Sequence, residues 1–303
     1  MVELKGVIPA LTTPFLEDQS LDLDGYKKLV DIVIDDGVHG VLANGCTGES
    51  WALDDDERLQ VFKATVEQVG GRVPVVAGCG AMLTRQAIGK VNQAMEAGCD
   101  AVMIQPPWYV IPGEDEIYDY YKAVIAASSL PVMLYNIPRR TSINMSVDLI
   151  DRLADEPMVI ALKESSKDWL VLSAMIRRVR HRINVFAGYA SLLGMAAISE
   201  GAVGYVDSTT PVVGRLSINF YEACISRDLD TARRLQTTLA GLNFFGTGTF
   251  PATVKAALNI LGRPGGYPRD PIKPVTEVQR DSIRTLLVDA GLIGKDIDNK
   301  GPQ

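Results

Sequence analysis

The sequence predicts an α/β fold, a (β/α)8 TIM barrel followed by a C-terminal helical extension. Eight short apolar runs, rich in β-branched residues, occur before residue 210, and segments with helical periodicity separate them. Near-continuous apolar strands that alternate with amphipathic helices indicate a parallel sheet covered by helices. Eight such repeats favour a closed barrel over an open doubly wound sheet.

The eight predicted strands share turn-forming residues at or near their carboxyl ends. They span residues 6–13, 40–45, 73–80, 101–107, 131–138, 159–165, 183–188 and 202–209. The spacing from one strand to the next leaves room for a helix and two loops, as a parallel connection requires.

Helix signals lie between these strands and do not depend on them. Asp54 with Glu57 three residues later predicts a capping box, and therefore a helix start. Thr84 predicts another N-cap, and Gly98 is placed to end the helix that follows it.

Beyond residue 210 only helical patterns remain. Helices are predicted at 216–226, 229–245, 252–261 and 275–290, with a Pro- and Gly-rich loop at 262–274 and a polar tail at 296–303. We therefore divide the chain into a barrel that carries the catalytic site, residues 1–226, and a helical extension, residues 227–303.

Composition narrows the possible partners. The 303 residues include 37 acidic and 30 basic ones, and the net charge of −7 disfavours a phosphate backbone or an anionic membrane as partner. No apolar stretch reaches the length of a membrane span. We therefore expect small-molecule substrates, no nucleic acid and no membrane.

The cysteines indicate the compartment. Cys46, Cys79, Cys99 and Cys224 form no CxxC pair, and no signal sequence precedes them. We expect four free thiols and a cytoplasmic protein.

Several cofactor classes lack their sequence signature. His39 and His181 are the only histidines, too few for a His-rich metal site. No GxGxxG follows the first strand, and no GxxxxGK[ST] occurs. We expect neither a metal nor a cofactor.

Lys163 is the unusual residue at the strand ends. It directly follows the buried run 159–162, so its ammonium is expected at the barrel mouth with little solvation, which lowers the pKa of the amine. A neutral amine there can condense with a ketone to a Schiff base, an electron sink that needs no cofactor. A structural ion pair with Glu164 or Glu49 is the alternative interpretation.

The turn at residues 45–48 can bind an anion. Its sequence, Gly45-Cys46-Thr47-Gly48, allows successive backbone N–H groups to converge, and the hydroxyl of Thr47 adds a donor. The carboxylate of a 2-oxo acid would fit there.

Two further side chains complete the candidate site. Tyr135 ends the neighbouring fifth strand, where its phenol can shuttle a proton at Lys163, and Arg140 offers a cation to a second carboxylate. Packing for Tyr135 and solvation for Arg140 are the alternatives, and for Arg139 solvation is the favoured interpretation.

At these residues the sequence resembles the dihydrodipicolinate synthase / N-acetylneuraminate lyase family of pyruvate-dependent class I lyases. The motifs are G-x-T-G-E at 45–49, Y-N-x-P-x-R-T at 135–141 and L-K-E at 162–164, and the resemblance covers nearly the whole chain. It implies a (β/α)8 barrel with a C-terminal helical extension, 2-oxo acid and aldehyde substrates, and a homotetramer built as a dimer of dimers.

The resemblance also implies roles for single residues. Lys163 would be the Schiff-base lysine, Tyr135 the proton shuttle, and the backbone of Cys46 and Thr47 the ligand of the keto acid's carboxylate. Tyr109 would complete the proton relay of a neighbouring subunit. Gly48, Gly188 and Tyr189 fall at further substrate-binding positions.

Arg140 in P-x-R-T is typical of the synthases in this family, where it holds the carboxylate of aspartate semialdehyde. Three features depart from their pattern: Cys46 stands in place of the relay threonine, Tyr189 and Ala190 follow Gly188, and the eighth strand has a polar end at 207–210. They leave open a catabolic member, an aldolase or dehydratase of 2-keto-3-deoxy sugar acids or a related deaminase.

A non-catalytic barrel that binds a keto acid is the alternative of another class. Lys163, Tyr135 and Tyr109 together argue against it, because a binding protein needs no proton relay.

The positions that hold feedback lysine in regulated synthases do not suit that ligand here. They are Asp55, Arg58, Met82, Gln86 and Trp108. We expect no inhibition by lysine.

Overall fold

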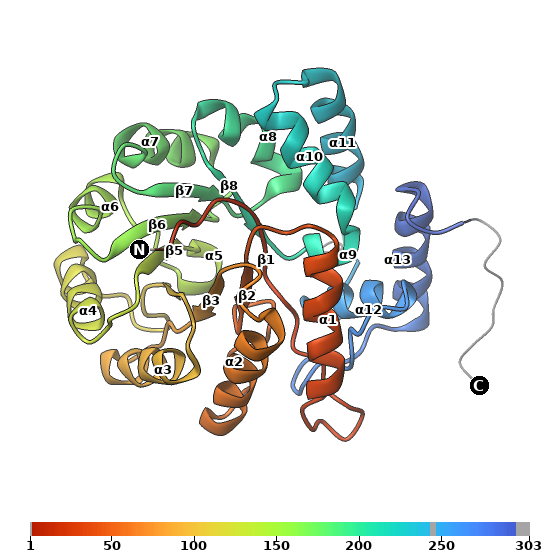
Figure 1. The fold of residues 1–303 in the computed structure, drawn as a ribbon, viewed down its shortest axis with the longest axis horizontal. Helices are drawn as coiled ribbons and strands as arrows, with labels where there is room; N and C mark the ends of the chain where they lie inside the picture. The colour runs from red at the N-terminus through yellow and green to blue at the C-terminus, as the bar shows by residue number, and fades with distance from the viewer. Residues whose placement is uncertain (1, 243–246, 295–303) are drawn as a thin grey trace.

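The fold is seen in a computed structural model, which describes residues 2–242 and 247–294. Figure 1 shows strands in the middle of the molecule with helices ringed around them. The strands are β1 Gly6–Pro9, β2 Val41–Ala43, β3 Val75–Gly78, β4 Ala101–Ile104, β5 Val132–Asn136, β6 Val159–Glu164, β7 Asn184–Ala187 and β8 Gly204–Asp207. Each lies within the run predicted for it.

All eight strands belong to one parallel sheet in the order β1-β8-β7-β6-β5-β4-β3-β2. A parallel bridge between Ala10 and Leu42 joins the edges of this sheet, and the N–H of Leu11 donates to the carbonyl of Leu42 at 3.0 Å. The (β/α)8 barrel that the sequence predicts is therefore confirmed.

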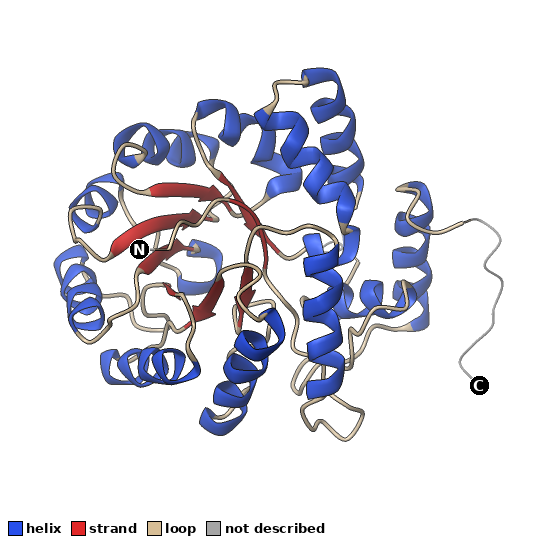
Figure 2. Ribbon diagram, viewed as in Figure 1, coloured by secondary structure: helices blue, strands red, loops and turns tan. Residues whose placement is uncertain are grey.

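At least one helix separates each strand from the next up to β8, and in the described residues beyond β8 only helices follow. Figure 2 shows the helices outside the strands. They are α1 Leu23–Asp35, α2 Asp55–Val69, α3 Thr84–Ala97, α4 Glu114–Ala126, α5 Pro138–Thr141, α6 Val147–Leu153, α7 Trp169–Val179, α8 Ala190–Glu200, α9 Thr210–Val213, α10 Arg215–Ile225, α11 Leu229–Gly241, α12 Ala252–Ile260 and α13 Glu277–Asp289. None of the helices in the described ranges is long and apolar enough to cross a membrane.

The helix termini test the capping predictions. The capping box of α2 is confirmed, since the N–H of Glu57 donates to Asp54 at 2.8 Å and the N–H of Asp54 donates to Glu57 at 3.2 Å. Gly98 ends α3 in the left-handed conformation, with φ +80°. The prediction for Thr84 was wrong: Leu83 has the extended backbone of an N-cap, and Thr84 is already helical.

The interior of the barrel is filled by side chains rather than hollow. Inward-facing apolar residues from alternate positions of the strands are buried together, including Ile8, Leu42, Val76, Met103, Met133, Ala161, Phe186 and Val206. A second apolar layer packs between the sheet and the helices. The barrel therefore has no open channel, and a site is expected at the carboxyl ends of the strands.

The C-terminal helices flank one side of the barrel, beside α1 in Figure 1. Helix α11 packs on α8 and α10, while α12 packs on α9 and α13. The predicted helix 229–245 is seen as α11 up to Gly241; residues 243–246 and the predicted tail 296–303 lie outside the described residues.

Candidate active site

Polar side chains gather in a small pocket at the carboxyl ends of the strands. Its volume is about 30 Å³. The lining residues are Cys46, Thr47, Tyr135, Ile137, Arg139, Arg140, Lys163, Ser165, Gly188, Tyr189, Asp207, Ser208 and Phe250. The structure thus brings together all the predicted site residues except Gly48 and Tyr109.

Lys163 lies at the centre of this pocket on β6. It pairs in register with Tyr135 on β5, and its Nζ lies 4.4 Å from the centre of the Tyr135 ring. The side chain is only 5% exposed. Burial lowers the pKa of Lys163 to about 8, although Cys46 and Asp207 act in the opposite direction.

The two carboxylates considered as structural ion-pair partners of Lys163 bond to other groups. Glu164 accepts hydrogen bonds from Asn136 at 3.2 Å and from the N–H of Ser166 at 2.7 Å. Glu49 is ion-paired with Lys255. Within the described ranges Lys163 forms no salt bridge, so its amine faces the pocket.

The turn after β2 is held by close backbone packing. The hydroxyl of Thr13 donates to the carbonyl of Gly48 at 2.8 Å, and a Cβ on Gly48 would lie 3.1 Å from the carbonyl oxygen of Leu11. Only glycine fits this approach without a shift of the neighbouring backbone. Gly48 therefore shapes the turn, while Cys46 and Thr47 reach the pocket.

The same turn depends on the C-terminal extension. Glu49 has a positive φ of 52° and is fully buried. Its carboxylate pairs with Lys255 on α12 and accepts from the N–H of Arg269 at 3.0 Å. Residues far along the chain thus fix the end of the turn.

Tyr135 is buried beside Lys163. Its pKa is raised well above the ordinary value, first by burial and then by the nearby Cys46 and Tyr189. The phenol is therefore protonated at neutral pH and can donate a hydrogen bond or a proton.

Because Gly188 has no side chain, the neighbouring Ser165 has room in the pocket wall. A Cβ on Gly188 would fall 1.8 Å from the hydroxyl oxygen of Ser165 and 2.8 Å from the carbonyl oxygen of Glu164. Any side chain at position 188 would displace Ser165 from the pocket wall.

The mouth of the pocket is positively charged. Arg139 and Arg140 both line it, and Lys167 lies 4.7 Å from the centre of the Tyr189 ring. Arg139, for which we favoured solvation, thus lies at the pocket as well. An anionic substrate would be attracted here despite the overall charge of −7.

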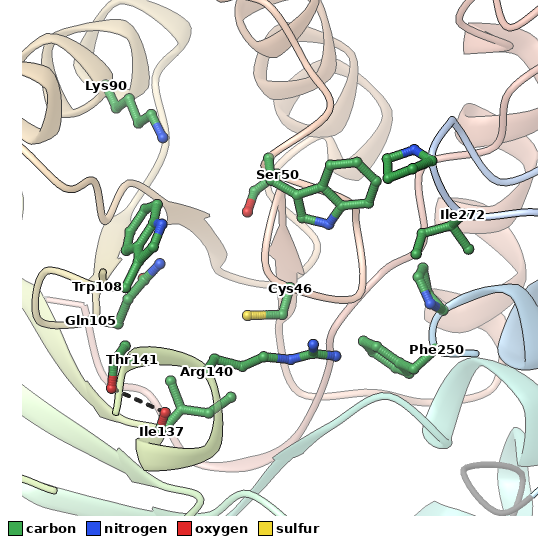
Figure 3. Close-up of a pocket in the computed structure, with 13 residues that line it drawn as sticks. Cys46, Ser50, Lys90, Gln105, Trp108, Ile137, Arg140, Thr141, Phe250 and Ile272 are labelled. Carbon is green, nitrogen blue, oxygen red and sulfur yellow. Dashed lines mark hydrogen bonds between the residues drawn. The ribbon is translucent and has the colours of Figure 1, made fainter. Parts of the chain in front are cut away.

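A larger cavity of about 370 Å³ adjoins the small pocket and shares Cys46, Ile137, Arg140 and Phe250 with it. Its other lining residues are Ser50, Trp51, Lys90, Gln105, Trp108, Thr141, Pro251, Pro271 and Ile272. In Figure 3 the guanidinium of Arg140 is directed at Phe250, 5.7 Å from its ring centre, with the Cys46 thiol nearby. The volume suits a second small substrate.

Tyr109 lies away from the pocket of its own chain. It follows β4 with a positive φ of 74°, and its side chain is 91% exposed. Val110 and Ile111 beside it are also exposed. An apolar loop of this kind is typical of an interface.

The residues at the positions that hold feedback lysine in regulated synthases line one cavity in this structure. Asp55, Arg58, Met82, Gln86 and Trp108 line a cavity of about 610 Å³. Arg85 and Lys90 line it too. Three cations around one carboxylate disfavour a cationic amine.

Besides Arg139, five lining residues were not predicted: Ile137, Ser165, Asp207, Ser208 and Phe250. The first four lie in the carboxyl-terminal parts of predicted strands, so strand-end position was a signal that could have found them. Phe250 precedes α12 and belongs to no motif we recognised, so only the folded chain brings it to the site.

Comparisons with known proteins agree with this geometry. The sequence profile of the dihydrodipicolinate synthetase family matches residues 3–290. A Rhizobium meliloti protein named "Uncharacterized DapA-like lyase" is 35% identical over 288 residues, which cover 93% of this chain and 94% of that protein. The 4-hydroxy-tetrahydrodipicolinate synthase of Desulforudis audaxviator is 35% identical over 294 residues, 96% of this chain and 99% of that enzyme.

A solved structure of a family member has the same fold. The chloride-inhibited dihydrodipicolinate synthase of Acinetobacter baumannii, crystallised with pyruvate, superimposes with a TM-score of 0.92 at 32% identity. The match covers 96% of this chain and all of that one. The protein therefore belongs to the dihydrodipicolinate synthetase family and is, like the members of that family, a Schiff-base lyase.

Proposed function

We propose that this lyase condenses pyruvate with aspartate semialdehyde through an imine on Lys163. The observation that carries the proposal is the state of this lysine: it is buried, it has a pKa near 8, and it lies 4.4 Å from the ring of Tyr135. At neutral pH roughly a tenth of such an amine is uncharged, far more than for an ordinary lysine. The pyruvate complex of the A. baumannii relative supports the choice of keto acid.

The reaction begins with attack of the neutral amine on the ketone. The nitrogen lone pair forms a bond to the carbonyl carbon, and the oxygen takes up a proton to give a carbinolamine. A second proton lets that oxygen leave as water, and a protonated imine remains. Loss of a methyl proton then gives an enamine, whose carbon attacks the aldehyde carbon of the second substrate while the aldehyde oxygen takes up a proton. Attack of the substrate's own amino group on the new iminium carbon, with proton transfer to the lysine nitrogen, then breaks the bond to Lys163 and releases the neutral amine.

The chain's own groups orient pyruvate for this attack. The backbone N–H groups of Cys46 and Thr47 and the Thr47 hydroxyl would hold its carboxylate. Gly48 keeps the turn tight, and Gly188 leaves room for the Ser165 side chain in the pocket wall.

Tyr135 would transfer the protons. Its phenol lies beside Lys163 and Cys46, and the Cys46 thiol would connect it to Tyr109 of a second copy of the chain. A thiol is a weaker hydrogen-bond donor than the hydroxyl found at this position in the family. Relay through Cys46 should therefore be slower than through a threonine.

Arg140 would bind the carboxylate of the semialdehyde. It lines both the Lys163 pocket and the adjoining cavity, so a substrate that fills the cavity passes its guanidinium. Tyr189 lines the Lys163 pocket together with Arg140 and would contact the part of the substrate that lies there.

A coupled assay tests the substrate. Pyruvate with aspartate semialdehyde should turn over, and Arg140→Ala should raise KM for the semialdehyde roughly 10- to 100-fold, the loss expected for a charge-assisted hydrogen bond. Arg152→Ala, which removes an exposed arginine paired with Asp115, is the matched control and should leave KM unchanged. Pyruvate binding without turnover would instead indicate a non-catalytic barrel.

A second candidate is a catabolic activity, an aldolase or dehydratase of 2-keto-3-deoxy sugar acids or a related deaminase. Tyr189 and Ser208 in the pocket wall favour it, because their hydroxyls suit a polyhydroxylated substrate. Turnover of such acids, with none of the semialdehyde, would select it.

We also propose a cytoplasmic homotetramer, a dimer of dimers. The four free cysteines suit a reducing compartment. The exposed apolar loop at Tyr109, Val110 and Ile111 suits an intersubunit contact.

A further inference from the structure

Asp207 is the one carboxylate among the described residues that line the Lys163 pocket. It ends β8, three strands from β5 around the barrel and two from β6. Its side chain is 6% exposed. A buried carboxylate at the end of a barrel strand is costly unless it has partners or a function.

The partners of Asp207 come from the short helix that follows. Oδ1 accepts from the N–H of Thr210 at 3.0 Å and from its hydroxyl at 2.7 Å, while Oδ2 accepts from the hydroxyl of Thr209 at 2.8 Å. A carboxylate can accept about four hydrogen bonds. These three therefore orient the group and leave Oδ2 with capacity for one more.

All three donors are neutral, so they do not balance the charge. Asp207 forms no salt bridge to any residue in the described ranges. The positively charged residues among those that line the pocket are Lys163, Arg139 and Arg140. Among the influences on the Lys163 amine, Asp207 is one that favours its charged form.

The proposed reaction puts a full positive charge on the Lys163 nitrogen, in the pocket that Asp207 also lines. The resting amine is neutral part of the time, but the protonated imine carries a full charge on the same nitrogen. The carboxylate of bound pyruvate offsets part of that charge, at the end of the molecule held by the Cys46–Thr47 turn. An anion that the fold already holds in the same pocket would stabilise the iminium without reorganisation.

We propose that Asp207 is the counter-ion of the iminium formed on Lys163, and so a further catalytic residue of this site. The inference rests on the proposed imine at Lys163. It also explains the polar end of β8: Thr209 and Thr210 hold the carboxylate in place.

Asp207→Asn tests the proposal, because asparagine keeps the shape and the acceptor for Thr210 while it removes the charge. Pyruvate is trapped on the enzyme with borohydride across a range of pH. The trapping midpoint should move about one pH unit toward acid, since an attractive anion has gone. At alkaline pH, where the amine is neutral in both proteins, the apparent pyruvate affinity should fall about tenfold because the iminium is less stable.

Two controls separate charge from structure. Thr209→Val removes a hydrogen bond to Asp207 and keeps the charge, and Glu164→Gln neutralises the neighbouring buried carboxylate outside the pocket. Both should keep the wild-type midpoint. Asp207→Ser, also uncharged, replaces the asparagine variant if that variant does not fold.

The outcomes are distinct. An unchanged midpoint and affinity in Asp207→Asn, or an equal shift in Glu164→Gln or Thr209→Val, would overturn the role of Asp207. Absence of any adduct on Lys163 in the wild type would instead overturn the proposed function.

Discussion

At the scale of single residues, the chemistry depends on how little water reaches Lys163. A lysine at the end of a buried strand predicts a lowered pKa, and the structure agrees, with a pKa of about 8 caused mainly by burial. The partly neutral amine makes attack on a carbonyl possible near neutral pH. The buried phenol of Tyr135, with its raised pKa, is protonated in the same pocket, where we propose that it transfers protons.

The pH dependence of kcat/KM for pyruvate follows from this pKa. Only the neutral amine attacks, so kcat/KM should rise with pH and level off above about 8. A solvated lysine would keep rising to about 10.4. A profile of initial rates between these limits checks the prediction, and a rise that continues beyond pH ~9.5 would contradict it.

Tyr135→Phe tests the proton transfer. Loss of the hydroxyl should lower kcat by about 10²–10⁴-fold, the usual contribution of a positioned acid or base. Pyruvate should still form an adduct, only more slowly. Tyr118→Phe, which removes a partly buried phenol that donates a hydrogen bond to Glu156 away from the site, is the control. Comparable losses in both variants would refute the assignment.

At the scale of elements, sequence patterns predicted the positions of the strands and of the site well. They did not predict the contacts between segments that are distant in the sequence. Apolar runs and the Asp54–Glu57 box placed all eight strands and the start of α2, because each depends on local periodicity or capping. The short helices α5 and α9 were missed, since four residues carry no period. Phe250 and the pairing of Glu49 with Lys255 depend on tertiary packing, so no local pattern predicts them.

That pairing should matter for stability. Lys255 is 1% exposed, pairs with Glu49, and donates to the carbonyl of Tyr267 at 2.6 Å. Lys255→Met would leave the Glu49 carboxylate buried without its cation. We expect the free energy of unfolding to fall by about 3–5 kcal/mol, measured by urea denaturation.

An exposed pair provides the matched control. Lys273 bonds to Asp270 at 2.5 Å with both side chains in solvent, so Lys273→Met should cost less than about 1 kcal/mol. If Lys255→Met and Lys273→Met lowered the free energy of unfolding equally, burial of the Lys255–Glu49 pair would not contribute to stability.

At the scale of the whole molecule, the sequence predicts an assembly of several copies, and a single chain does not contain the interface between them. The site of a single chain contains every proposed catalytic side chain except Tyr109, which is 91% exposed. The family resemblance gives Tyr109 its role, and the exposed loop around it is where a second copy would dock.

Mixed subunits test this arrangement. Tyr109→Ala and Lys163→Ala should each lose most activity as pure proteins. When they are unfolded together and reassembled, a site with Lys163 from one copy can receive Tyr109 from the other, and activity should return. No recovery, in mixtures shown by mass spectrometry to contain hybrids, would mean that Tyr109 does not act across the interface.

The cavity at the positions of the feedback-lysine site gives a prediction about inhibition of the whole enzyme. Arg58, Arg85 and Lys90 surround it, with Asp55 as the carboxylate. Repulsion of the lysine side chain should leave condensation uninhibited. Half-inhibition at sub-millimolar lysine in steady-state assays would refute this expectation.

The most direct test of the account is to identify the lysine that binds pyruvate. Lys90 and Lys255 also have pKa values lowered by burial, so low basicity alone does not single out Lys163. After incubation with pyruvate and borohydride, digestion and mass mapping should find the reduced adduct on the peptide that contains Lys163. An adduct on Lys90, Lys255 or any other lysine, or no adduct at all, would contradict the mechanism.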